Sequence, residues 1–407
     1  MRRPALVIVP VLILLIGVGL PFFHVNLANG SPTTLLPVGR ESRDAYAALA
    51  NDFPAGETTP TTILLIDHTG GNPLAADRIP ALVAYTNRLA AYPHVGHVDG
   101  PTTWQPGLSA AQWQAFYGGP QAQPVIGQYV QGDRMRISVV TPAEATSDTA
   151  QGIARAVRHT AAPAGMTAQV GGAAAQEIDI VHDIRATAPD AILIVMLVTM
   201  AVLFLTFGSV FLPLKAAFVS LISLTASYGA LVWIFQDGHG GGFLHFTADG
   251  TTSATVPIFM FAILFSLSMD YEVLMLSRIQ EEYRKTGDNR EAIATGLAAT
   301  ARVITGAASI MVVVFGGFAL ADIVFIKALG VGLAIAVAVD ATIVRVLLVP
   351  AIMRLMGRWN WWAPTSVAAF TRRLGLGETA TPEPTRTPSR LHGSAPGASA
   401  RVEAEGD

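Results

Sequence analysis

Two carboxylates stand inside an apolar stretch of this 407-residue chain. Residues 256–277 read VPIFMFAILFSLSMDYEVLMLS, with Asp270, Tyr271 and Glu272 past the middle. A carboxyl group that is neutral when buried and ionised when wetted can carry a proton, and a neighbouring tyrosine hydroxyl can donate a hydrogen bond to it. Proton transfer within an apolar layer is the chemistry that these residue types indicate.

The depth of Asp270 determines how unfavourable its charge is. At about 1.5 Å of rise per residue, Asp270 lies about 4–5 Å from the middle of a helix over 256–277. An aspartate at that depth in a bilayer costs on the order of 2.5–3.5 kcal/mol on insertion scales. The alternatives are a structural hydrogen-bond partner or the end of a shorter span. A span ending at Met269 would keep only about 14 apolar residues, too few to cross a bilayer comfortably.

Helical spacing groups the polar residues of this stretch. Asp270 follows Ser266 by four residues and precedes Ser277 by seven, and both spacings place residues on one face of an α-helix. We expect this face to point into a helix bundle. Glu272 lies about 200° round the helix and closer to one end of the span. The pattern leaves open whether Glu272 is an interfacial carboxylate or part of the site.

A second pair of charges lies in the last apolar run, AIAVAVDATIVRVLLVP, which contains Asp340 and Arg345. An isolated ion in lipid is untenable, so each residue needs a partner or a water-filled cavity. Five residues place the two about 140° apart on an α-helix, which argues against a simple pair on one face. Arg345 could instead extend to the interface, whereas Asp340 is expected to act between helices.

The composition is that of a membrane protein. Hydrophobic residues make up 51% of the chain and charged residues only 14%, against about a quarter in soluble domains. The net charge is −3 with no basic block, which gives no support to a nucleic-acid partner. Cysteine is absent, so disulfides and cysteine-based metal sites are excluded.

Apolar runs of about 20 residues, long enough to cross a bilayer, occur six times. The first begins after Arg2 and Arg3 but is longer than a signal-peptide core and lacks a clear cleavage site, so we expect an uncleaved span. The predicted spans cover residues 4–23, 191–211, 214–235, 256–277, 303–322 and 327–349.

The distribution of basic residues predicts cytoplasmic N- and C-termini. The short segments 236–255 and 323–326 contain no lysine or arginine, and Lys327 sits at the edge of the second. The segments assigned to the cytoplasm contain Arg2, Arg3, Lys215, Arg278, Arg284, Lys285, Arg290, Arg302, Arg354 and Arg358.

Between the first and second spans, residues 24–190 have a soluble composition and predict an extracytoplasmic domain. Strand patterns at 61–67, 95–98, 135–140 and 166–172 alternate with helical patterns at 76–92 and 146–161, where Ser147 is a plausible N-cap. The order is that of the α+β ferredoxin-like fold, interrupted by a Pro-, Gly- and Gln-rich insertion at 101–132. Residues 363–407 predict a disordered cytoplasmic tail.

Signatures of soluble enzymes are weak in this chain. HGGG at 239–242 occurs without a G-x-S-x-G nucleophile elbow, and His94 and His97 have no further ligands at metal-site spacing. No phosphate-binding G-x-x-x-x-G-K-[ST] motif occurs. We therefore expect no enzyme activity, no metal and no cofactor, and any transport would use an ion gradient or a partner.

Three segments carry a resemblance to a known family. SLSMDYEVLMLSRIQEEY, GLAATARVITGAASIMVVVFGGFAL and GVGLAIAVAVDATIVRVLLVPAIMRLMGRWNWWAP resemble the mycobacterial membrane protein large (MMPL) family of the resistance–nodulation–division transporters. The resemblance runs from about residue 4 to 364. Members have twelve spans in two repeats, each with one helix, a porter domain and five helices, and this chain looks like the second repeat alone.

The resemblance implies proton-driven export of lipids or other amphiphiles. It implies that Asp270 and Tyr271 form the proton relay, with Ser266, Glu272, Asp340 and Arg345 as possible support. With one repeat, a second copy or a separate chain would supply the other half, or the product is truncated and inactive. A second hypothesis is a scaffold or regulatory subunit that does not transport, and a membrane-embedded enzyme is a distant third.

Overall fold

The computed structural model describes residues 3–28, 36, 39–53 and 56–362. Within these residues, six helices are long and apolar enough to cross a membrane, at Ala5–His24, Ala173–Phe207, Phe211–Gln236, Thr255–Thr286, Asn289–Leu320 and Val324–Trp361. They correspond to the six apolar runs of the sequence. The predicted tail at 363–407 lies outside the described residues.

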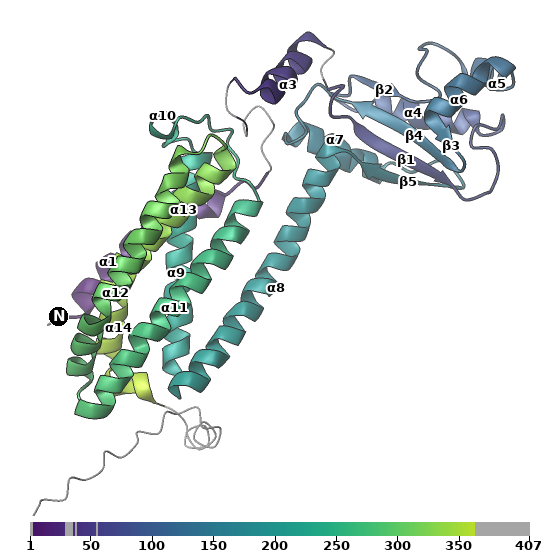
Figure 1. The fold of residues 1–407 in the computed structure, drawn as a ribbon. Coiled ribbons are helices and arrows are strands. Elements are labelled where there is room, and N and C mark those ends of the chain that lie inside the picture. The colour runs from purple at the N-terminus through teal and green to yellow at the C-terminus, as the bar shows by residue number, and fades with distance from the viewer. Residues whose placement is uncertain (1–2, 29–35, 37–38, 54–55, 363–407) are drawn as a thin grey trace, which may run out of the picture.

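The six helices form a bundle, and the domain between the first and second helix lies beyond one of its ends (Figure 1). Helix α9 packs against α1, α8 and α13, while α11 packs against α12 and α13. The bundle comprises α1 (Ala5–Gly19), η1 (Leu20–His24), α8 (Ala173–Phe207), α9 (Phe211–Leu231), η3 (Val232–Gln236), α10 (Gly241–Leu244), α11 (Thr255–Thr286), α12 (Asn289–Gly317), η4 (Phe318–Leu320), α13 (Val324–Val339), η5 (Asp340–Leu348), α14 (Val349–Met356) and η6 (Gly357–Trp361).

Several helices extend past their predicted spans, and local capping residues explain where they stop. The long segment predicted between the fourth and fifth spans is helical except for Gly287 and Asp288. Gly287 has a φ of 69°, the left-handed conformation that ends a helix and favours glycine. The Asp288 side chain accepts hydrogen bonds from the backbone N–H groups of Arg290 and Glu291 and so starts α12.

Outside the bundle, a mixed domain contains a short antiparallel sheet with strand order β2-β4-β1-β5, and β3 pairs with β4. Each of the four predicted strands and both predicted helices has a counterpart here. The elements are α3 (Glu41–Asp52), β1 (Thr61–Asp67), α4 (Ile79–Ala90), β2 (His97–Asp99), α5 (Ala110–Tyr117), η2 (Pro120–Ala122), α6 (Gln123–Tyr129), β3 (Val130–Gln131), β4 (Arg134–Val140), α7 (Asp148–His159) and β5 (Met166–Gly171).

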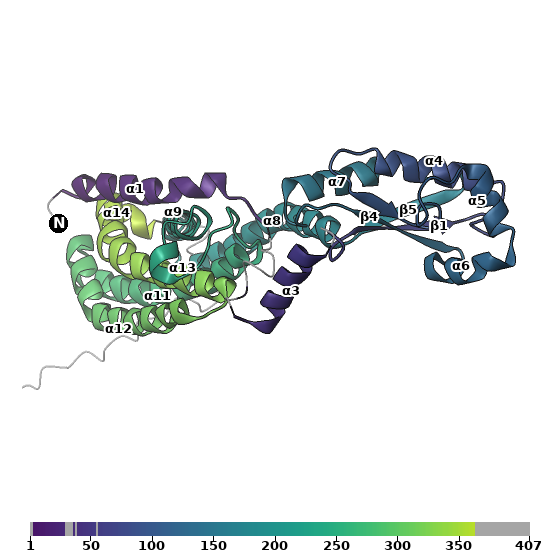
Figure 2. The ribbon, with the colours of Figure 1, turned by 90° about the horizontal axis from the view of Figure 1, so that it is seen from above.

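Helices α4 and α7 lie on the same side of this sheet (Figure 2). Alternate residues of β1 are buried beneath them, as the period of two in a strand requires. Ser147 caps α7 by accepting a hydrogen bond from the Ala150 N–H. The domain core contains Ile63, Leu65, Leu74, Leu82, Tyr85, Leu89, Val98, Met135, Ile137, Val139, Ile153, Val157 and Met166.

The insertion at 101–132 contains α5, η2, α6 and β3, with the buried Trp113 as an anchor. The boundary placed at residue 190 falls inside α8, which starts directly after β5. Gly172 forms that junction with a φ of 98°, and a Cβ there would come within 2.4 Å of the Pro60 carbonyl oxygen.

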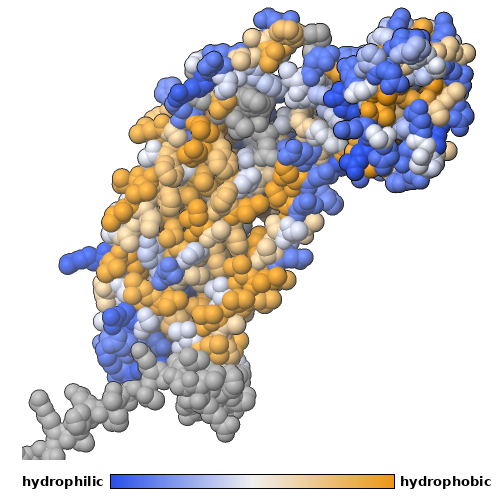
Figure 3. Space-filling view, turned by 45° about the vertical axis from the view of Figure 1, so that its right-hand side comes forward, coloured by the Kyte–Doolittle hydropathy of each residue, from blue (hydrophilic) through white to orange (hydrophobic). Residues whose placement is uncertain are grey.

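The surface follows the same division. Hydrophobic side chains cover the bundle in a broad band, whereas the domain is mostly hydrophilic (Figure 3). Apolar side chains at the surface are expected where lipid replaces water as the solvent. The structure is therefore that of a multi-pass membrane protein with one large non-membrane domain.

Candidate functional site

Asp270 lies halfway along α11, and its side chain is exposed on the surface of this chain. Ser266 and Ser277 are exposed as well, so the three residues share a face as their spacing requires. That face points away from the neighbouring helices, and the expectation that it points into this bundle is wrong for the chain by itself. Spacing decides which residues share a face, but packing decides which face is covered.

Unlike Asp270, Tyr271 faces the interior of the bundle. Its ring is half-buried, and the Arg345 guanidinium lies over it at 5.0 Å from the ring centre. At this distance a cation is attracted to the face of an aromatic ring. Asp270 and Tyr271 are adjacent in sequence, but Asp270 lies on the outer face of α11 and Tyr271 contacts a charged cluster within the bundle.

Asp340 and Arg345 form an ion pair, contrary to the geometric argument from the sequence. The Arg345 Nε and Nη2 atoms donate to Asp340 Oδ2 at 3.0 and 2.9 Å. The reason is that residues 340–348 form a π-helix rather than an α-helix. Hydrogen bonds in a π-helix link residues five apart, which brings such residues to one side.

Arg345 does not extend to the membrane interface. Its side chain is only 3% exposed, and it also donates to the carbonyl and hydroxyl oxygens of Ser268 on α11. The guanidinium thereby joins the last span to the span that carries Asp270 and Tyr271. Buried arginine is tolerable in such a place because a carboxylate and further acceptors surround it.

Glu272 is the second carboxylate of the cluster, and it is 4% exposed. Its Oε1 lies 3.3 Å from Nζ of Lys215, which is 5% exposed at the start of α9. Glu272 is therefore part of a buried ion pair, and its partner Lys215 is one of the basic residues counted toward the cytoplasmic side. Lysine and glutamate each compensate the charge that would make the other untenable when buried.

The Asp340–Arg345 pair and Glu272 line one small cavity, together with Ser220 and Ser268. Among the described residues, Lys215 Nζ, Glu272 Oε1 and Arg345 Nη1 have no hydrogen-bond partner. Buried polar atoms in proteins are almost always hydrogen-bonded, so a group of three that are not is unusual. The cluster of four charges is thus electrostatically paired but not fully hydrogen-bonded.

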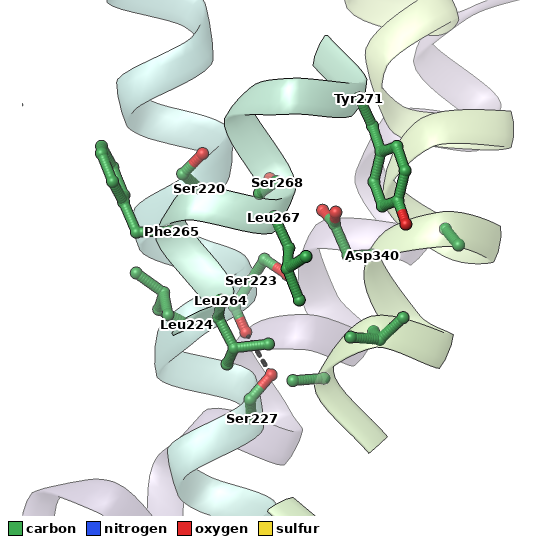
Figure 4. A pocket seen from close by; sticks show the side chains of 13 residues that line it. Ser220, Ser223, Leu224, Ser227, Leu264, Phe265, Leu267, Ser268, Tyr271 and Asp340 are labelled. Atoms are coloured by element: carbon green, nitrogen blue, oxygen red, sulfur yellow. Dashed lines mark hydrogen bonds between the residues drawn. The ribbon is translucent and has the colours of Figure 1, made fainter. Parts of the chain in front are cut away.

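A second cavity continues from this cluster along α9 (Figure 4). Asp340 and Tyr271 line one part of it, and serines line another. The polar lining residues are Ser220, Ser223, Ser227, Ser268, Tyr271 and Asp340. Apolar side chains of α9, α11 and α13 complete the wall.

A polar cleft lies where the domain meets the bundle. It is bounded by residues 26–28 after α1, by one face of α7 and by one face of α8. Asp148, Gln151, Arg155, His182 and Arg185 supply most of its polar character.

The remaining motifs lie apart from the charged cluster. His97 pairs with Glu57 in the domain at 3.2 Å. The HGGG stretch runs into the short helix α10, and the His239 ring stacks on Trp233 with 4.5 Å between ring centres. Neither place joins the residues discussed above.

Sequence reasoning missed Lys215 and Ser268 as members of the cluster. The signal for Lys215 was a single cation within FLPLKAAF, next to the apolar run of α9. Its partner is far away in sequence, so spacing could not join them. Ser268 could not be found, because it contributes its backbone carbonyl as well as its hydroxyl.

Comparison with known proteins identifies relatives of this chain. A sequence model of the MMPL family matches residues 34–384. The trehalose monomycolate exporter MmpL3 of Mycobacterium tuberculosis is 33% identical over 388 residues, covering 95% of this chain and 39% of that protein. A putative membrane protein of Streptomyces coelicolor is 36% identical over 388 residues, covering 95% of this chain and 48% of that protein.

A third relative matches a shorter region. The heme uptake protein MmpL11 of Mycobacterium tuberculosis is 44% identical over 199 residues, which cover 49% of this chain and 20% of that protein. The chain therefore spans less than half the length of the curated relatives it matches. The names of these relatives describe export, uptake or a membrane protein.

Proposed function

The chain belongs to the MMPL family, and from this premise we propose that it is half of a transporter driven by the proton-motive force. Its cargo would be lipids or other amphiphilic molecules, exported across the cytoplasmic membrane. The observation that carries the proposal is the cluster of Lys215, Glu272, Asp340 and Arg345 beside Tyr271. Charges held in a membrane bundle at this expense are typical of ion pathways and proton relays.

The proposed relay is Asp270 with Tyr271, supported by Glu272, Asp340 and Arg345. Protonation of Asp270 removes a charge from the middle of a span, so that lipid or an apolar helix face can then pack against this position. Tyr271 connects this event to the Arg345 ion pair, because its ring touches the guanidinium. The resulting repacking of α11 against the last span would move α8 and the domain. Ser266 belongs to the same face and is proposed as relay support.

A partner that covers Asp270 is part of the proposal. A carboxylate exposed to lipid at mid-span is unfavourable, so a second copy of this chain or a separate chain with the other half should pack there. Two further observations support this. Only 11% of the apolar window of α8 is buried within the chain. Leu49 of α3 and Phe53 after it are 41% and 59% exposed.

We propose that the domain is a ferredoxin-like porter domain on the outer side, with both termini cytoplasmic. The strand and helix order β1-α4-β2-β4-α7-β5 and the sheet order β2-β4-β1-β5 support this assignment. The orientation is supported by the basic residues Arg278, Arg284 and Lys285 near the end of α11 away from the domain. The polar cleft with Arg155, His182 and Arg185 is the proposed place for a cargo headgroup.

The test is export by a reconstituted assembly of the full chain with its other half or a second copy. Asp270→Asn, which removes the carboxylate, and Tyr271→Ala, which removes the ring, should each abolish export while expression and assembly stay normal. Asp183→Asn, at an exposed position on α8 outside the apolar run, is the matched control and should export normally. Export that persists in Asp270→Asn and still depends on the proton gradient would overturn the relay.

A further inference from the structure

The chain leaves the first span for the domain through residues 24–28, and this segment is attached to the connection between α9 and α11. Thr252 of that connection donates its backbone N–H to the Asn26 carbonyl oxygen at 2.8 Å and accepts from the Ala28 N–H at 3.1 Å. The two bonds form a parallel bridge between Leu27 and Thr252. The short helix α10 of the same connection lies at the end of the bundle nearer the domain (Figure 1).

One side chain, Gln236, completes this attachment. Its Oε1 atom accepts from the Asn26 N–H at 2.8 Å and from the Thr252 hydroxyl at 3.3 Å, and its Nε2 atom donates to the His24 carbonyl oxygen at 3.1 Å. The Gln236 side chain is buried. An amide offers both donors and an acceptor, so it can satisfy a backbone N–H and a backbone C=O that no helix or sheet uses. Gln236 therefore joins the end of α9 to both ends of the bridged segments.

A local irregularity of the helix directs Gln236 toward this segment. Residues 232–236 form η3, a π-helix, and the Asp237 N–H donates to the Val232 carbonyl oxygen five residues earlier at 3.0 Å. A π-turn contains one residue more than an α-turn, and such turns are rare and frequent at functional sites. The described part of the bundle also has a π-helix at 340–348. Each of the two brings a buried polar side chain to its partners.

Helix α1, which precedes the segment, packs closely on α9 as well. A Cβ on Gly229 of α9 would lie 2.1 Å from the Val18 carbonyl oxygen of α1, so the two backbones approach each other directly. His24, at the end of η1, also lies 3.2 Å from Asp237, which follows η3. The chain connects the domain to the bundle by α8 on one side and by residues 24–28, held on α9, on the other.

We propose that Gln236 is a positioning residue that makes the domain follow the end of α9 when the bundle repacks. A segment without helical structure transmits a displacement only if it is held at a fixed point, and the Gln236 amide provides that point. The domain would then be moved by α8 and α9 together. The attachment is independent of the export function, whereas its use to move the domain rests on the proposed function.

The first experiment measures hydrogen exchange of the full chain in lipid nanodiscs. The Asn26 and Ala28 amides should exchange slowly in the wild type, because both are hydrogen-bonded. Gln236→Met keeps the length of the side chain but removes the amide, and it should accelerate exchange at Asn26 about tenfold. Gln280→Met is the matched control, because the Gln280 amide joins α11 to the Phe207 carbonyl at the other end of α8. Equal exchange at Asn26 in wild type and Gln236→Met would overturn the attachment.

The second experiment measures export by the assembled transporter. Gln236→Met should lower the export rate about tenfold at unchanged expression and assembly. Because the chain has no cysteine, Leu27→Cys and Thr252→Cys can be added to this variant and joined by a short thiol cross-linker, which should restore most of the export. Thr251→Ala is the control in the same connection and should export normally, because the Thr251 hydroxyl donates to Asp249 rather than to the segment.

The outcomes separate this inference from the proposed function. A Gln236→Met variant that exchanges fast at Asn26 but exports at the wild-type rate overturns the positioning role, as does cross-linking that restores no export. Slow exchange at Asn26 and Ala28 in a wild type that exports nothing under a proton gradient leaves the attachment standing. That last result overturns the proposed function and, with it, the use of Gln236 to move the domain.

Discussion

The domain outside the bundle and the helix bundle itself surround buried carboxylates in different ways. In the domain, Asp67 is 4% exposed and receives hydrogen bonds from the backbone N–H and hydroxyl of Thr69 and from Arg78. In the bundle, Glu272 Oε1 pairs with Lys215 at 3.3 Å but accepts no hydrogen bond from the described residues. The buried carboxylate of the domain is thus fully hydrogen-bonded by nearby residues, whereas Glu272 of the bundle is not.

This difference indicates that the two regions are built for different purposes. A fully hydrogen-bonded carboxylate fixes a single structure, and any change of its charge is unfavourable. A buried ion pair with spare donors and acceptors contributes little net stability but can change partners. The charged cluster of the bundle therefore fits the proposed role in proton-coupled movement, because such a pair contributes little to the stability of the fold.

The largest expected effect comes from breaking the Lys215–Glu272 pair. Lys215→Met leaves Glu272 buried without a counter-charge and should destabilise the bundle by about 3–5 kcal/mol. The double variant Lys215→Met with Glu272→Leu removes both charges and should recover most of that loss. The measurement is a denaturant titration of the purified protein in detergent, followed by tryptophan fluorescence.

Lys285→Met is the control for this pair, because Lys285 lies at an exposed helix end with its side chain 57% exposed. Its effect should stay within about 0.5 kcal/mol. A double variant as unstable as Lys215→Met would mean that the pair itself holds the bundle together, and the contrast with the domain would be lost.

The next effect concerns packing without charge. A Cβ on Gly229 of α9 would lie 2.1 Å from the Val18 carbonyl oxygen of α1, so Gly229→Leu should force the two helices apart. We expect a loss of about 2–3 kcal/mol in the same titration, because backbone atoms cannot move aside as side chains do. Gly17→Leu on α1 meets no atom within 4 Å and should be close to wild type. Equal stability of the two variants would show that α1 does not pack tightly on α9.

A smaller effect is expected at Asp67 and depends on pH. The Thr69 hydroxyl and backbone N–H, together with Arg78, hold the pKa of this carboxyl below its ordinary 3.8. The folded-state pKa is depressed, so the stabilisation is complete above pH 3.8 and is lost as pH falls through the folded pKa. Asp67→Asn should lower the Tm of the domain at neutral pH and flatten its decline on the acid side. Asp133→Asn, at an exposed site, should leave the Tm–pH curve unchanged.

The smallest effect tests the local start of α7. Ser147→Ala removes the side chain that accepts from the Ala150 N–H at 3.2 Å and should cost about 1 kcal/mol in domain stability. Thr149→Ala, at an exposed position in the first turn, should change stability by less than about 0.5 kcal/mol. Domain unfolding followed by circular dichroism measures both, and equal losses would remove the capping role of Ser147.

Local pattern was enough to predict most elements of both regions. The apolar runs locate the six long helices because length and hydropathy are properties of a single segment. The domain strands and the Ser147 cap are likewise visible in a few consecutive residues. The end of α11 at Gly287 and the start of α12 at Asp288 follow the same logic, although the prediction placed a longer connection there.

The arrangement of the charged cluster could not be predicted in this way. Glu272 and Lys215 lie on different helices, and no pattern in either segment reports the distance between them. Asp340 and Arg345 appear incompatible on an α-helix, and the sequence gives no local sign of the π-helix that unites them. The exposure of Asp270 could not be predicted either, because it depends on which helices pack against α11.

Helix α8 has a mechanical consequence that follows from its length. It runs from Ala173 to Phe207 without a break in its assigned helix, with Pro189 inside. A proline removes one backbone hydrogen bond and is the natural pivot of such a rod. The arms on either side of this pivot measure about 24 Å and 27 Å at the usual rise per residue. Because the arms are nearly equal, rotation of α8 as a rigid rod about Pro189 would move its Phe207 end and the base of the domain by similar distances in opposite directions.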